Sequence, residues 1–113
     1  MNSDELKQQI AQAIGPRYGQ MTVDLVAILY PPLARVGLAD AKAVFTALLS
    51  RDADETLKAA YALMTNDELV EAKAKLVDLL SLRAGDNAAV VQAINTALLK
   101  AVEFALSLAL VGL

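Results

Sequence analysis

The stretch that decides the fold is residues 88–113, AAVVQAINTALLKAVEFALSLALVGL. It contains no proline, and only Lys100 and Glu103 are charged. Most of it is Ala and Leu, which are strong helix formers. Asp86 or Asn87 can cap its start, because short polar side chains accept hydrogen bonds from the free backbone N–H groups. The sequence therefore predicts one helix of about twenty-five residues, far longer than an average helix.

This long helix has two apolar lines and little room for solvent. A projection at about 100° per residue defines a first, inner line. It consists of Val90, Ile94, Leu98, Ala101, Ala105 and Leu108. A second line resembles the seam of a coiled coil and consists of Leu99, Val102, Leu106, Leu110 and Leu113. The remaining polar stripe is narrow and consists of Gln92, Thr96, Lys100, Glu103 and Ser107.

Three interpretations of this helix compete. It can be the central helix of a bundle, wrapped by shorter helices. Alternatively, its second apolar line stays exposed and pairs with a protein partner or a second copy, since large apolar patches on soluble proteins mark interfaces. A membrane span is the least favoured, because it needs about 20 apolar residues. Lys100 and Glu103 interrupt the stretch, and residues 104–113 are too few.

Capping signals and helix breakers predict five shorter helices before the long one. They are expected at residues 3–14, 22–30, 39–50, 54–64 and 65–84. Thr22 is the expected N-cap of the second, and Pro31-Pro32 should end it because proline lacks a backbone donor. Thr65 and Glu68 form a capping box at the start of the fifth, and Gly85 is its expected C-cap.

The expected fold is a single all-α domain over residues 1–113, a bundle of about five or six helices with a long hydrophobic C-terminal helix. A chain of this length has room for one hydrophobic core. Spacing assigns apolar side chains of the third to fifth helices to that core. They are Ala41, Val44, Phe45 and Leu48, then Leu57, Tyr61 and Met64, then Leu69, Val70, Leu76, Val77 and Leu80.

Composition excludes several classes of function. The net charge of −3 has the wrong sign for a protein that binds nucleic acid through phosphate contacts. The chain has neither histidine nor cysteine, which removes the commonest general base, metal ligand and thiol nucleophile. Its acidic N-terminus, MNSDE, is unlike a secretory signal. We therefore expect a cytoplasmic protein that is not an enzyme.

Acidic residues cluster at Asp52, Asp54 and Glu55, and again at Asp67, Glu68 and Glu71. A calcium loop needs more oxygen ligands at alternating positions and a central glycine, which neither cluster has. Acidic residues at a helix start cap the helix and complement its dipole. No glycine pattern for binding phosphate occurs either. The sequence thus predicts helix caps, and no catalytic, metal or cofactor site.

The leading functional hypothesis is a non-enzymatic helical module for protein–protein interaction or self-association. Its partner would be another protein or itself, as a possible homodimer. The residues expected to bind the partner are Leu99, Val102, Leu106, Leu110 and Leu113. The alternative is a carrier of a small apolar ligand inside the bundle, because the expected interior is apolar with few polar groups.

Overall fold

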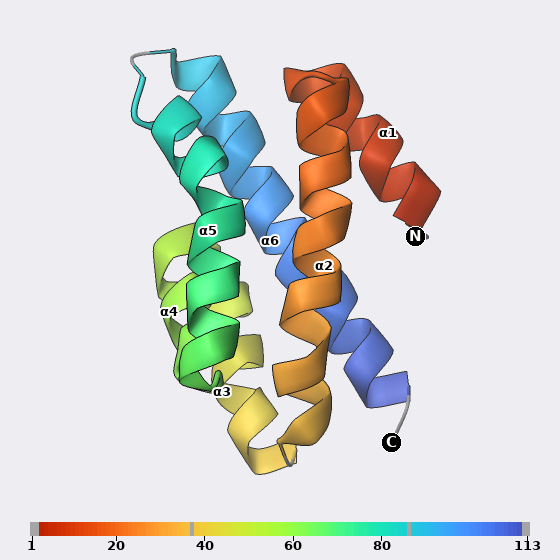
Figure 1. The fold of residues 1–113 in the computed structure, drawn as a ribbon, viewed down its shortest axis with the longest axis vertical. Coiled ribbons are helices and arrows are strands. Elements are labelled where there is room, and N and C mark those ends of the chain that lie inside the picture. Colours follow the sequence, from red (N-terminus) through yellow and green to blue (C-terminus); the bar gives the residue numbers. More distant parts are fainter. Residues whose placement is uncertain (1–2, 37, 86, 112–113) are drawn as a thin grey trace.

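The chain folds into a bundle of helices that run up and down around the last one (Figure 1). The computed structural model describes residues 3–36, 38–85 and 87–111. These residues form six helices and no strand, which confirms the all-α prediction. The helices are α1 (Ser3–Ile14), α2 (Pro16–Arg35), α3 (Leu38–Leu49), α4 (Ala53–Tyr61), α5 (Asn66–Arg83) and α6 (Ala88–Val111).

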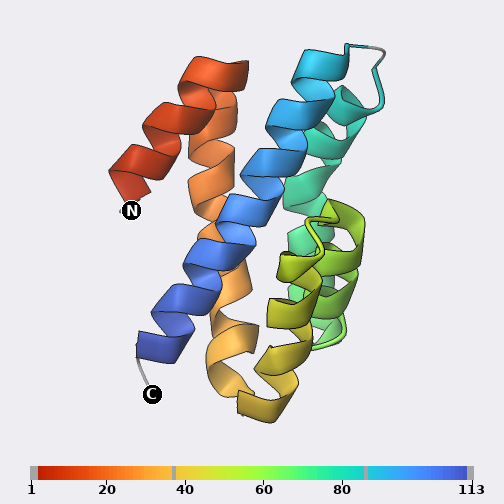
Figure 2. The same ribbon diagram turned by 180° about the vertical axis from the view of Figure 1, so that it is seen from behind.

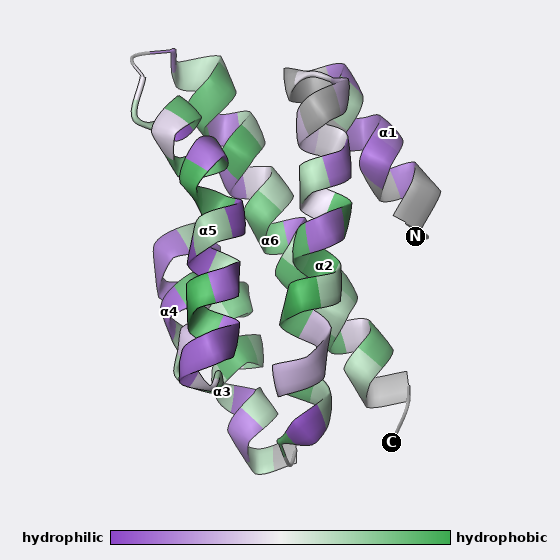
Figure 3. Ribbon diagram, in the orientation of Figure 1, coloured by the Kyte–Doolittle hydropathy of each residue, from purple (hydrophilic) through white to green (hydrophobic). Residues whose placement is uncertain are grey.

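Helix α6 is the centre of the bundle, because it packs against each of the other five helices. Figure 3 shows it mostly in the colours of apolar residues. Its fully buried side chains are Ile94, Ala97, Leu98, Ala101, Val102 and Ala105. The alanines among them let neighbouring helices approach closely. By length and composition alone, Ala88–Ala109 could also cross a membrane. In this fold, the apolar residues on its inner side fill the core.

Helix α2 differs from the sequence prediction at both ends. It begins at Pro16 rather than Thr22, whose hydroxyl lies inside the helix and donates a hydrogen bond to the Tyr18 carbonyl at 2.8 Å. It also continues through Pro31 and Pro32. Pro31 leaves the carbonyl of Ala27 without its helical donor, but both residues are exposed, so water can bind that carbonyl.

The local caps follow the sequence closely. The Asp52 carboxylate accepts a hydrogen bond from the Glu55 backbone N–H and caps α4. Both hydrogen bonds of the Thr65–Glu68 capping box are present at the start of α5. The side chain of Asn87 caps α6 by accepting from the backbone N–H groups of Ala89 and Val90. Asp86, the other predicted cap, lies outside the described residues.

The predicted cap at Gly85 is wrong. Helix α5 ends with Ala84 as its C-cap, in right-handed helical backbone. The N–H of Gly85 donates to the Leu82 carbonyl, and Gly85 does not adopt the left-handed backbone that favours glycine in this position. The turn thus closes without the conformation that makes glycine necessary.

Several predicted core residues are at the surface instead. Phe45 is 51% exposed on α3, Val70 and Val77 are 70% and 55% exposed on α5, and Leu108 on α6 is also exposed. The inner face of α5 is formed by Ala72, Leu76 and Leu79. Spacing along a helix finds an apolar face, but which part of it is covered depends on the position of the neighbouring helices.

Helix α1 lies against α2 and α6. The two helices approach each other closely at Gly19 of α2, where a Cβ atom would lie 2.5 Å from the backbone oxygen of Lys7. The ammonium group of Lys100 donates to the side-chain oxygen of Gln9 at 3.2 Å and so links α6 to α1. One side of α6 is therefore held by α1 and the other by α3 and α4.

Candidate functional site

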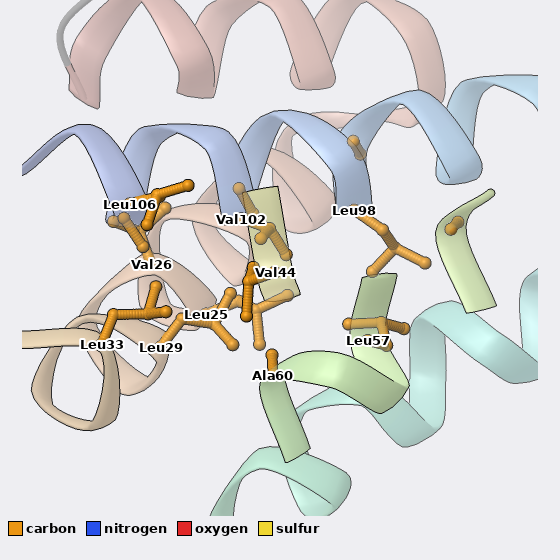
Figure 4. Close-up of a cluster of buried hydrophobic side chains, with 14 of the residues drawn as sticks. Leu25, Val26, Leu29, Leu33, Val44, Leu57, Ala60, Leu98, Val102 and Leu106 are labelled. Carbon is orange, nitrogen blue, oxygen red and sulfur yellow. The ribbon is translucent and has the colours of Figure 1, made fainter. Parts of the chain in front are cut away.

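The residues that the sequence assigned to a partner interface do not form an exposed seam. Val102 is 0% and Leu106 4% exposed. Figure 4 shows them among the side chains of the core, with Val102 beside Val44 and Leu106 beside Val26. Leu99 is half-buried against the core. The side chains of Leu110 and Leu113 lie outside what the structure describes.

The seam is buried because α2 and α3 cover this part of α6. The central-helix interpretation of α6 is thus correct for Val102 and Leu106. An exposed face of α6 nevertheless exists, rotated away from the predicted seam. Figure 2 shows α6 crossing the back of the molecule, between α1 on one side and α3 and α4 on the other.

Two neighbouring hollows lie along this face and share the lining residues Arg51, Leu99 and Glu103. We call them together the α6 groove. The first has a volume of about 840 Å³ and the second about 480 Å³. Because three residues border both hollows, the hollows are adjacent, and we call these three residues the junction of the groove.

The first hollow is the polar half of the groove. It follows the N-terminal part of α6, and its further lining residues are Ala88, Val91, Gln92, Asn95, Thr96 and Lys100. Gln92, Thr96, Lys100 and Glu103 belong to the polar stripe that the sequence predicted. The structure therefore gives this stripe a location: it faces the groove.

The second hollow is the apolar half of the groove. It lies between α3 and α6, and its further lining residues are Phe45, Leu48, Leu49, Leu106 and Ser107. Phe45 and Leu49 are 51% and 68% exposed, so two large apolar side chains of α3 face solvent at the edge of the groove. Isolated exposed apolar residues are common, whereas these two lie next to each other along one hollow.

The junction carries opposite charges on its two walls. Arg51 lies between α3 and α4, and Glu103 lies on α6. Among the described residues, neither side chain has an ion-pair partner. Half-buried Leu99 lies between the halves. The junction thus has one cation, one anion and an apolar residue available for contact.

Arg51 also has an unusual backbone conformation. Its φ of 61° is in the left-handed region, which residues other than glycine rarely adopt. The conformation lets the chain turn sharply between α3 and α4, where the Arg51 N–H donates to the Leu48 carbonyl at 3.1 Å. The turn places the Arg51 side chain at the junction of the groove.

Two arginines outside the groove, Arg83 and Arg35, hold helices together. Arg83 on α5 donates to Asp54 on α4 at 2.8 Å and to Asn95 on α6 at 2.9 Å. The guanidinium of Arg35 binds the carboxylate of Glu68 and lowers the pKa of that carboxyl from 4.5 to about 2. These contacts therefore bridge helices, and only Asn95 among these residues also lines the α6 groove.

The described residues bring together no group of three or more side chains that could hold a metal ion. Burial raises the pKa of the Tyr61 hydroxyl, so this phenol stays protonated at neutral pH and is not an activated nucleophile. The arrangement of the groove, with an apolar edge, a polar half and a charged junction, is suited to binding rather than to proton transfer.

Sequence reasoning missed the groove residues that lie outside α6. It assigned Phe45 to the core and gave no role to Leu49 or Arg51. The only available signal was the apolar excess of α3, which has more large apolar residues than one buried face of a twelve-residue helix can hold. Comparisons of the chain with protein families, with curated proteins and with solved structures found no match.

Proposed function

We propose that this chain is a non-enzymatic helical interaction module that binds an apolar segment of a protein in the α6 groove. The observation that carries the proposal is the position of exposed Phe45 and Leu49 beside the α6 groove. Apolar side chains next to a hollow are typical anchors of protein interfaces, and the polar half supplies hydrogen-bonding groups for a rim. The binding residues therefore differ from the predicted seam, of which Leu99 and Leu106 remain as lining.

The alternative proposal, a carrier of a small apolar ligand, has less support. A carrier encloses its ligand in an apolar cavity. Both hollows of the α6 groove instead lie along the surface, and charged side chains line each of them. The net charge of −3 continues to argue against nucleic acid as a partner, and we retain a cytoplasmic location as part of the proposal.

The chain offers a matched pair of variants for the test. The groove variant is Phe45→Ser/Leu49→Ser, and the control is Val70→Ser/Val77→Ser on α5. The control residues have closely similar exposure, 70% and 55% against 68% and 51%. Since all four side chains are largely exposed, both variants should melt within a few degrees of the wild type.

The wild type and both variants are used to capture proteins from cells that produce the chain, and a captured protein is purified and titrated by calorimetry. We expect the wild type and the α5 control to bind equally. The groove variant should bind at least about tenfold more weakly, because each lost apolar anchor contributes on the order of 1 kcal/mol. Equal affinity of the groove variant, or loss of binding in the α5 control, would reject the proposal.

A further inference from the structure

We infer that the occupant of the α6 groove is a second copy of this chain, docked about a two-fold axis that runs along the groove. The inference rests on the interaction surface proposed above and names its partner. A two-fold interface brings the same patch together from both copies, so the patch must be complementary to itself. The junction of the groove meets this condition in charge.

The charge argument concerns Arg51 and Glu103. They border both hollows, they come from different elements of the fold, and neither has an ion-pair partner among the described residues. One wall of the groove is α6, which carries Glu103, and the other is the turn between α3 and α4, which carries Arg51. A two-fold axis along the groove places the α6 wall of one copy opposite the turn of the other copy. Arg51 of each copy then faces Glu103 of the other, which gives two equivalent ion pairs.

The same axis matches the apolar surfaces. Rotation about an axis along the groove leaves each half opposite its own copy. Phe45 and Leu49 of one chain then cover the apolar half of the other chain's groove. The two polar halves face each other at the solvated end of the interface. Leu99 lies at the junction and meets Leu99 of the second copy near the axis. The two α6 helices therefore run parallel in the dimer.

The backbone of Arg51 gives independent support. A left-handed φ of 61° is unfavourable for arginine, and glycine would adopt it without strain. Residues held in such conformations often serve a function that the strained geometry makes possible. Here the strained turn carries a guanidinium group at the centre of the groove. This guanidinium group has no ion-pair partner among the described residues of its own chain. In the dimer, Glu103 of the second copy is its partner.

Charge reversal with mixing tests the inference on the full chain. Arg51→Glu and Glu103→Arg are prepared separately, and their masses are measured by sedimentation and native mass spectrometry, alone and in an equimolar mixture. In a homodimer of either variant, both contacts between positions 51 and 103 would join like charges. In a mixed dimer, both contacts again join opposite charges. Lys75→Glu and Glu71→Arg, on the exposed face of α5, change the net charge by the same amounts.

We expect the wild type and both α5 controls to be dimeric. Each junction variant alone should have a dissociation constant for the dimer at least tenfold higher than the wild type. Mixing the two junction variants should restore the dimer as a one-to-one heterodimer. The double variant Arg51→Glu/Glu103→Arg should dimerise with itself. A monomeric wild type at hundreds of micromolar, or no recovery on mixing, would overturn the inference. The wild type can prove monomeric while the Phe45→Ser/Leu49→Ser variant no longer binds a captured protein. That result rejects a second copy as the occupant, but the groove remains the binding surface.

Discussion

The guanidinium of Arg35 binds both carboxylate oxygens of Glu68, with Nη2–Oε1 at 2.7 Å and Nη1–Oε2 at 3.0 Å. It also donates to the carbonyl of Leu63 at 3.0 Å. These contacts fasten the end of α2 to the turn before α5. Glu68 belongs to the capping box of α5 at the same time, since its carboxylate accepts from the Thr65 backbone N–H. One carboxylate thus both starts a helix and joins two helices.

This double role predicts an acid-sensitive contribution to stability. The hydrogen bonds from Arg35 and, second, from the Thr65 backbone N–H lower the pKa of Glu68 from 4.5 to about 2, so the contribution is complete above pH 4.5 and is lost as the pH falls to about 2. The melting temperature of the wild type should therefore fall more steeply in this window than that of Glu68→Gln. Melts followed by circular dichroism between pH 2 and 6 measure the difference. Parallel curves would show that the pair contributes no pH-dependent stability.

Gly19→Ala should destabilise the protein although alanine favours helices. The gain in helix propensity is about 1 kcal/mol. The added Cβ atom would lie 2.5 Å from the Lys7 backbone oxygen, and overpacking of this kind costs roughly 1–3 kcal/mol or more. We expect a lower melting temperature and faster amide hydrogen exchange throughout α1. Gly85→Ala is the control, because its Cβ atom would lie 3.3 Å from the Leu82 carbonyl oxygen, so the protein should lose clearly less stability than with Gly19→Ala.

Leu106→Glu distinguishes a buried second line of α6 from an exposed one. Leu106 is 4% exposed, so the substitution places an unpaired carboxylate against the core and should cost several kcal/mol, as Leu98→Glu should. Thermal melts and sedimentation of both variants make the comparison. A folded, monomeric Leu106→Glu protein with a normal melting temperature would show that the seam faces solvent after all.

Arg51→Gly should raise the stability of the monomer while weakening the dimer. Relief of the left-handed backbone contributes roughly 1–2 kcal/mol, and the greater freedom of glycine in the unfolded chain costs roughly 0.5–1 kcal/mol, which leaves a gain of roughly 0.5–1 kcal/mol. Arg51→Ala keeps the strain but also removes the charge, so it should weaken the dimer without the gain. Denaturant titrations at low protein concentration and sedimentation at high concentration measure the two effects. A less stable Arg51→Gly monomer would contradict this account of the turn.

The sequence predicted the helices well where the determinants are local. The capping box at Thr65 and Glu68, and the caps at Asp52 and Asn87, depend on side chains that lie within a few residues of the backbone groups they bind. The rule that proline ends a helix failed at Pro31, because its consequence depends on whether water can reach the carbonyl one turn earlier. That access is a property of the folded molecule.

The candidate site could not be predicted because it depends on contacts between distant segments. Phe45 and Val44 are neighbours on the same apolar helix, yet only Val44 points into the core. Which of the two is covered depends on the position of α6, which comes much later in the chain. Arg51 gave no signal at all, since its φ of 61° follows from the geometry of the turn and not from its residue type.

The central position of α6 has a consequence for synthesis on the ribosome. Leu25 and Leu29 on α2 and Leu76 on α5 are fully buried in the finished protein, in a core that α6 completes. At about 5–20 residues per second, the ribosome needs one to several seconds to add residues 88–111 after α5. During that interval the nascent chain has helices but no complete core. Its apolar faces are then open to chaperones, and folding finishes only when α6 has emerged.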